Sequence, residues 1–97
     1  MMMAAARRVT RTGREPVHPG YLLETRYLKP LGLSQISLAE ALGISRRRVN
    51  ELVRGRRAMT PDTAVRLAAY FKTDPEFWMQ LQLAWDMHRA LRISRSR

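Results

Sequence analysis

The spacing of small and apolar residues in 35–52 constrains this chain more than any other feature. Two short helices can cross closely only where a small residue lies between them, and Ala39 meets that need. Four positions later, Gly43 can adopt the positive φ that a tight interhelical turn requires. Apolar residues at helical spacing can hold the pair together: Leu38, Leu42, Ile44, Val49 and Leu52. Together these residues predict a helix-turn-helix.

Capping residues predict where the two helices begin and end. Ser34 is a favourable N-cap for a helix over about 35–42, and Ser45 is one for a helix over about 46–54. Glycines follow both segments as C-caps. Three further helices are expected over about 19–29, 61–72 and 75–91.

We expect Pro30 to stop the first helix and the chain to fray after Leu91. No strand pattern is present in the sequence. The chain therefore reads as one all-α, five-helix domain over residues 16–92. A flexible basic arm over 1–15 and a basic tail over 93–97 flank it.

The formal net charge of +10 predicts a polyanionic partner, which is nucleic acid, an anionic membrane surface or an acidic protein. Six arginines and one acid, Glu51, lie between Arg46 and Arg57, so this segment carries half of the net charge. Three consecutive arginines at a helix N-terminus oppose the helix dipole unless an anion binds there. An inert αα-hairpin would instead carry mixed charges. We expect the second helix to face the major groove of double-stranded DNA.

The N-terminal part of the second helix meets base edges in such motifs. Arginine pairs with guanine, asparagine with adenine, and glutamate can accept from cytosine. The candidate base readers are Ser45, Arg46, Arg47, Asn50 and Glu51. The candidate phosphate contacts are Arg48, Arg54, Arg56 and Arg57. For Gln35 two roles remain open, a phosphate contact at the N-terminus of the first helix and simple capping.

The last predicted helix has two apolar stripes. One consists of Phe77, Trp78, Leu81, Ala84, Trp85, His88 and Leu91, and the other of Met79, Leu83, Met87 and Ala90. One helix of a small domain cannot bury both faces on its own core, so a homodimer through the second stripe is expected. A two-fold dimer would place two recognition helices roughly 34 Å apart on a palindromic operator. A monomer with exposed methionines is the alternative.

The residues give little support to a function as an enzyme, a metal-binding protein or a membrane protein. The sequence has no Ser/His/acid set, no paired carboxylates and no Gly-rich phosphate loop, so an enzyme is not expected. With no Cys and two distant histidines, neither a metal site nor another cofactor is predicted. The apolar runs are too short to span a bilayer. The arginines follow the N-terminal apolar stretch, unlike a signal peptide. We expect a cytoplasmic protein with no membrane or small-molecule partner.

Several motifs in combination resemble one known family, the HigA (VapI-like) antitoxins of type II toxin–antitoxin modules. They are His18-Pro19-Gly20, Leu31-Gly32-Leu33-Ser34-Gln35, Ala39-Glu40-Ala41-Leu42-Gly43-Ile44-Ser45-Arg46, Val49-Asn50-Glu51-Leu52-Val53, Gly55-Arg56-Arg57, Thr60-Pro61-Asp62-Thr63-Ala64 and Pro75-Glu76-Phe77-Trp78-Met79. The resemblance covers about residues 17–88. It departs from the family at Tyr21, which is usually Glu, and at Ile36, which is usually polar.

The resemblance implies a lambda-repressor-like five-helix fold, a homodimer and a partner toxin of the RelE-like mRNA-cleaving class. The antitoxin would neutralise that toxin and repress the operon that encodes both. Two alternatives stay open. One is a stand-alone transcription regulator without a toxin. The other is a toxin-binding module that has lost DNA binding, against which the arginine-rich surface argues.

Overall fold

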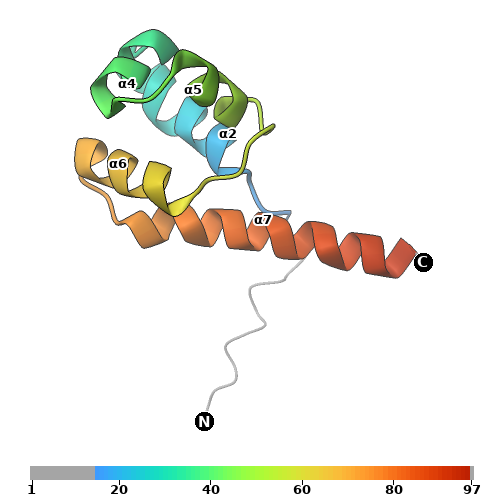
Figure 1. The fold of residues 1–97 in the computed structure, drawn as a ribbon. Coiled ribbons are helices and arrows are strands. Elements are labelled where there is room, and N and C mark those ends of the chain that lie inside the picture. Colours follow the sequence, from blue (N-terminus) through green and yellow to red (C-terminus); the bar gives the residue numbers. More distant parts are fainter. Residues whose placement is uncertain (1–14, 97) are drawn as a thin grey trace.

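The computed structural model describes residues 15–96, and this part of the chain is all-helical with no β-strand (Figure 1). The elements are α2 (Pro19–Leu23), η3 (Glu24–Leu28), α3 (Lys29–Leu31), α4 (Gln35–Leu42), α5 (Arg46–Val53), α6 (Pro61–Phe71) and α7 (Pro75–Ser96). Because α2, η3 and α3 follow one another without a break, they form one helix, and the predicted all-α, five-helix fold is confirmed. Figure 1 shows α7 as a long rod below the other helices, with its C-terminal part extending past them.

The prediction that Pro30 ends the first helix is wrong. The helix continues through Pro30 and ends at Gly32, which has a φ of 63°. A proline inside a helix lacks the N–H donor and its ring clashes with the carbonyl four residues earlier. Here the turn just before it is a π-helix, Glu24–Leu28, and the Lys29 N–H bonds five residues back to the Glu24 carbonyl. This wider turn is the local adjustment that lets the helix pass the proline.

The last helix is also longer than predicted, because α7 runs to Ser96 instead of ending near Leu91. The sequence has no glycine or proline after Pro75, so nothing in it breaks the helix. Arg95 lies in the last turn, where a positive charge favours the helix dipole. Most of the predicted tail over 93–97 is therefore helical. The predicted arm over 1–15 lies outside the described residues except for Glu15.

The predicted N-caps Ser34 and Ser45 and the predicted C-cap Gly43 are confirmed, whereas the C-cap of α5 is Arg54 and not the glycine that follows it. Three side chains accept a hydrogen bond from the backbone N–H three residues later, namely Ser34 from Ser37, Ser45 from Arg48 and Thr60 from Thr63. Gly43 has a φ of 73° and closes the turn between α4 and α5. Each such N-cap stabilises a helix by about 1 kcal/mol. The limits of α4 and α5 therefore follow from local sequence.

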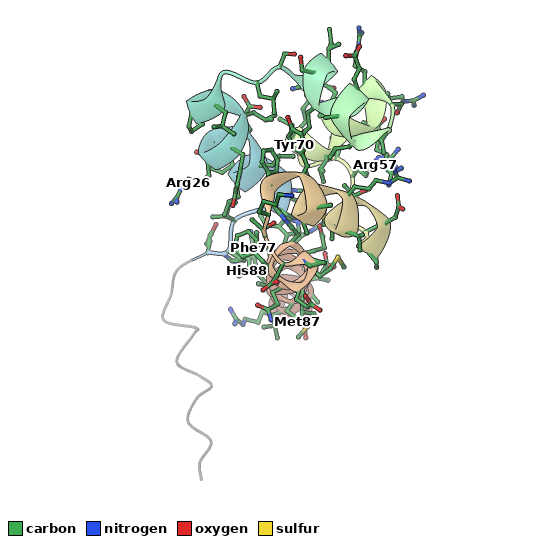
Figure 2. All side chains as sticks on the ribbon, turned by 90° about the vertical axis from the view of Figure 1, so that its left-hand side faces the viewer. Arg26, Arg57, Tyr70, Phe77, Met87 and His88 are labelled. Atoms are coloured by element: carbon green, nitrogen blue, oxygen red, sulfur yellow. The ribbon has the colours of Figure 1, made fainter. Side chains whose placement is uncertain are left out.

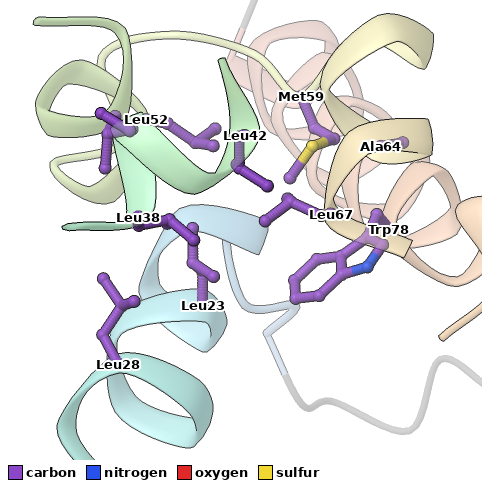
Figure 3. Packing of buried hydrophobic residues seen from close by; sticks show 11 residues of the cluster. Leu23, Leu28, Leu38, Leu42, Leu52, Met59, Ala64, Leu67 and Trp78 are labelled. Carbon is purple, nitrogen blue, oxygen red and sulfur yellow. The ribbon is translucent and has the colours of Figure 1, made fainter. Parts of the chain in front are cut away.

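One apolar core joins the helix-turn-helix to the rest of the domain (Figure 3). Its fully or almost fully buried members include Leu23, Leu38, Leu42, Val49, Leu52, Met59, Ala64, Leu67 and Trp78. Ala39 is buried at the crossing of α4 and α5 as predicted, while Ile44 and Phe71 pack partly buried on the core. The indole of Trp78 has no exposed surface, and its Nε1–H donates to Thr73 Oγ1 over 2.9 Å. The α4–α5 pair is thus held against α6 and α7 by shared side chains.

The motif His18-Pro19-Gly20 connects the start of α2 to the end of α5. His18 is the N-cap of α2, and its Nδ1 accepts from the Gly20 N–H over 2.9 Å. The backbone of Gly20 lies directly against the end of α5, where a Cβ would be 1.7 Å from the Leu52 carbonyl oxygen. The His18 ring packs edge-on against Trp85 of α7, with 5.2 Å between ring centroids. The motif therefore joins α2, α5 and α7.

Burial of His18 predicts a dependence of stability on pH. The pKa of His18 lies below its ordinary value of 6.5, chiefly because burial removes solvent from the imidazolium; Asp86 opposes and Arg89 adds to this shift. A histidine with a lowered folded pKa contributes stability that is complete above the unfolded pKa and is lost as the pH falls through the folded pKa. We expect the free energy of unfolding to fall below pH 6.5, measured by urea denaturation.

The matched control is His18→Asn, which keeps an N-cap acceptor but cannot titrate. Because both proteins contain His88, the difference between their pH profiles reports His18 alone. The variant should lose less stability than the parent protein between pH 7.5 and 5. Identical pH profiles would contradict the assignment.

Candidate nucleic-acid interface

The exposed side of α5 and the loop after it carry most of the predicted DNA contacts. We call this surface the arginine face; it consists of Arg46, Arg47, Asn50, Arg54, Arg56 and Arg57, all exposed. Figure 2 shows Arg57 projecting from one side of the molecule and Arg26 from the opposite side. Val49 and Leu52 on the other side of α5 are buried, so core packing turns the arginine face outward. The folded chain therefore brings these six predicted residues together.

A hollow of about 540 Å³ lies where the N-termini of α4 and α5 approach each other. Its lining residues are Gln35, Ile36, Ser45, Arg46, Arg47 and Asn50. Asn50 Nδ2 donates to Gln35 Oε1 over 3.1 Å, which joins the two helices at this point. Ser34, not Gln35, is the N-cap of α4. The structure therefore favours a role for Gln35 at the interface over the capping alternative.

Glu51 holds two arginines of the arginine face. Arg47 Nε is 2.9 Å from one carboxylate oxygen, and Arg57 donates to the other from Nε at 3.0 Å and Nη2 at 2.8 Å. The hydrogen bonds from Arg47 and then Arg57 keep the pKa of Glu51 below its usual range. Both oxygens of the ionised carboxylate are thus engaged within the protein, which orients Arg47 and Arg57 instead of presenting Glu51 to a cytosine.

Arg48 differs from the prediction that it contacts phosphate. Its Nη2 lies 2.7 Å from Asp62 Oδ2 and 2.6 Å from Thr63 Oγ1, both in α6, and only 25% of its side chain is exposed. Its side chain therefore points toward α6 and not out of the arginine face. Its partners lie 14 and 15 residues away, beyond the reach of local sequence patterns.

Arg46 differs from its neighbours in α5. Within residues 15–96, no carboxylate pairs with Arg46, whereas Arg47 and Arg48 are both engaged. Arg54 is the C-cap of α5 and precedes the loop that carries Arg56 and Arg57. Among the three arginines at the N-terminus of α5, Arg46 is therefore the one whose side chain no carboxylate of the described residues holds.

The sequence did not predict two residues whose side chains bind the backbone of the helix-turn-helix and of the loop after it. Gln82 of α7 is buried between the predicted stripes, and its Oε1 accepts from the Met59 N–H over 2.7 Å. Gln82 Nε2 also donates to Asp86. Arg66 of α6 donates to the Leu42 carbonyl oxygen over 2.8 Å at the C-terminus of α4. The contacts with Met59 and Leu42 were not predictable from local sequence, because these two partners lie 23 and 24 residues away.

The second apolar stripe of α7 is divided by the structure. Met79 is partly buried and packs on the core of its own domain. Leu83, Met87 and Ala90 are exposed, with 61% of Leu83 and 44% of Met87 accessible to solvent. Figure 2 shows Met87 on the side of α7 that faces away from the other helices. Leu83, Met87 and Ala90, named here the α7 apolar face, are therefore the predicted dimer contacts that stay exposed among residues 15–96.

A helix-turn-helix family model matches residues 26–78 of this chain. Virulence-associated protein I of Dichelobacter nodosus is 49% identical over 74 residues, which are 76% of this chain and 68% of that protein. Antitoxin HigA-1 of Vibrio cholerae is 39% identical over 79% of this chain and 72% of its own. The chain belongs to the HigA/VapI family of helix-turn-helix proteins.

Solved structures of this HigA/VapI family share the fold. The Pseudomonas aeruginosa antitoxin HigA, solved with the higBA promoter, superposes with a TM-score of 0.81 at 36% identity and covers 84% of this chain and 89% of its own. The antitoxin GraA in complex with its operator gives a TM-score of 0.75 at 40% identity, with 82% and 81% covered. The resemblance of this sequence to HigA antitoxins is confirmed by both comparisons.

Proposed function

We propose that this protein is a HigA-like antitoxin that binds operator DNA and represses its own operon. The observation that carries the proposal is the arginine face, which lies on the second helix of the helix-turn-helix and is turned outward by the core. The HigA and GraA relatives described above, which share this fold, were solved with promoter and operator DNA. Because operator DNA in a bacterium lies in the cytoplasm, the proposal places the function there. No helix in the described range 15–96 is long and apolar enough to cross a membrane.

The proposed function is recognition without catalysis. Arg46 enters the major groove at the helix N-terminus and pairs with guanine, while the linked Asn50 and Gln35 read an adjacent position. Arg54, Arg56 and Arg57 bind phosphates and set the register on the duplex. Repression follows when the bound protein occupies the promoter and excludes polymerase.

The direct test measures binding of the purified protein to a fluorescent duplex from the region upstream of its own gene. A scrambled duplex of the same base composition is the control. We expect tighter binding to the upstream duplex at physiological salt, and an affinity that falls steeply as salt is raised. Equal affinity for the two duplexes, or a salt-independent affinity, would overturn the proposal.

The protein acts as a homodimer through the α7 apolar face. Single exposed apolar residues are ordinary, but Leu83, Met87 and Ala90 follow one another along one helix and are flanked by Leu91 and Ile93, which are also exposed. A second copy would cover this stripe and place two arginine faces on a palindromic site.

Met87→Glu is expected to convert the dimer into a monomer, because it would bury a carboxylate in an apolar contact. Sedimentation velocity at micromolar concentration measures the change, and a substitution at an exposed apolar residue of α6, Val65→Glu, is the control. If the parent protein sediments as a monomer, the dimer is excluded.

The proposal includes a RelE-like, mRNA-cleaving toxin as the second partner. The family membership supports an antitoxin, and copurification with the product of the adjacent reading frame tests it. The alternative is a stand-alone regulator. An uncharacterized HTH-type transcriptional regulator of Escherichia coli, YbaQ, is 42% identical over 76% of this chain and 66% of its own, so the relatives of this chain also include proteins named as regulators. Absence of an adjacent toxin-sized reading frame would favour this alternative.

A further inference from the structure

A chain of polar contacts runs from the recognition helix to the helix before it by way of α6. Arg48 of α5 donates to Asp62 Oδ2 over 2.7 Å. The same oxygen accepts from Arg66 Nε over 3.1 Å, and Arg66 Nη1 then donates to the Leu42 carbonyl oxygen over 2.8 Å. We call these four residues the Asp62 clamp. Asp62 is its only acid and the member that contacts both arginines.

The clamp reaches both helices of the helix-turn-helix and the turn between them. Leu42 is the last residue of α4, and Arg66 Nη1 is 3.4 Å from the position that a Cβ on Gly43 would occupy. Arg48 also bonds to Thr63 Oγ1, and Thr63 is buried, so this end of the clamp is anchored in the fold. Arg66 therefore lies against the turn while Arg48 holds the first turn of α5.

We propose that Asp62 is a positioning residue that sets the sequence discrimination of the DNA interface without contacting DNA. The inference rests on the proposed function and extends it to a residue outside the arginine face. Base readout requires the reading side chains to be held within about 0.5 Å of their productive positions. The shared core fixes the distance between α4 and α5, and the clamp adds a constraint on the rotation of α5 about its own axis.

Because Asp62 is charged, its positioning role can be distinguished from a purely electrostatic effect on DNA affinity. A carboxylate near a DNA-binding surface repels phosphate, so its removal alone raises the affinity for every duplex. Loss of positioning would instead lower the affinity for the specific duplex and leave the affinity for other duplexes unaffected. The pKa of Asp62 is held below its usual range by the hydrogen bond from Arg48 and then that from Arg66, so the carboxylate is ionised at neutral pH.

The experiment compares Asp62→Ala and Asp62→Asn with the parent protein on the upstream duplex and the scrambled duplex. The ratio of the two affinities should fall about fivefold in Asp62→Ala, because affinity for the scrambled duplex rises while affinity for the upstream duplex does not. Asp62→Asn removes the charge at nearly constant shape and should give a smaller fall. Glu40→Gln is the matched control, since it removes one exposed acid from α4 outside the clamp.

Amide hydrogen exchange supplies a readout that does not depend on DNA. The Gly43 and Ile44 N–H groups both bond to the Ala39 carbonyl oxygen at the turn that Arg66 contacts. Their exchange should become faster in Asp62→Ala and stay unchanged in Glu40→Gln. If the parent protein binds no duplex, the proposed function fails, while this measurement still tests the clamp.

Two results would overturn the proposal. One is an unchanged affinity ratio in Asp62→Ala together with a thermal unfolding curve like that of the parent protein. The other is a rise in affinity that is equal for the two duplexes and equal in Asp62→Ala and Glu40→Gln. That result would show that Asp62 acts only as a surface charge.

Discussion

Gly20→Ala is expected to destabilise the fold by about 3 kcal/mol or more. The added methyl would lie 1.7 Å from the Leu52 carbonyl oxygen and 2.5 Å from its carbonyl carbon. Both atoms are backbone, so no side-chain rotation relieves the clash and α2 must move away from α5. Chemical denaturation followed by circular dichroism measures the loss. Because α2 supports the end of the recognition helix, DNA affinity should fall in any fraction that still folds.

Gly32→Ala is the matched control for that substitution. Gly32 has a φ of 63° and nothing within 4 Å of the position of an added Cβ, so its cost is backbone strain alone, about 1 kcal/mol. The difference between the two variants isolates the contact with Leu52. A Gly20→Ala protein as stable as Gly32→Ala would show that α2 and α5 do not approach each other this closely.

Arg46→Ala is expected to lower affinity for the upstream duplex by about tenfold to a hundredfold. Arg46 is exposed at the first position of α5, and within the described part of the chain no acid holds it. Removing a bidentate guanine contact should cost affinity mainly on the specific sequence, and discrimination at one base pair should relax. Fluorescence anisotropy with single base-pair substitutions measures both effects.

Arg26→Ala removes the same charge from the side of the domain opposite Arg57 of the arginine face and serves as the control (Figure 2). It should change affinity only slightly, and equally for the upstream and scrambled duplexes. If Arg46→Ala and Arg26→Ala change the two affinities equally, Arg46 does not read a base, and its assignment within the arginine face is wrong.

Much of the architecture could be predicted because its causes are local. Ser34, Ser45 and Thr60 cap the residues that immediately follow them, and Gly43 closes a turn of its own chain neighbours. Pro30 shows where such a rule fails. Its effect depends on the preceding turn, and the π-helical turn of Glu24–Leu28 lets the helix pass it.

The candidate site was predictable as a surface but not as a set of contacts. Helical periodicity is enough to separate the buried Val49 and Leu52 from the exposed arginines. It is not enough to say that Arg48 turns to α6 or that Glu51 holds Arg47 and Arg57. Those directions depend on which acids the fold brings near each guanidinium.

The sequence by itself determined the all-helical character, the N-caps Ser34, Ser45 and Thr60, the helix-turn-helix and its strongly positive second helix, since each depends on residues within a few positions of one another. Only the tertiary structure decided which of these residues are available to a ligand. Asp62 and Arg66 reach α5 and α4 because the core packs α6 beside them, and Gly20 is required because α2 meets Leu52. Contacts between distant segments arise from packing, and packing is a property of the whole chain.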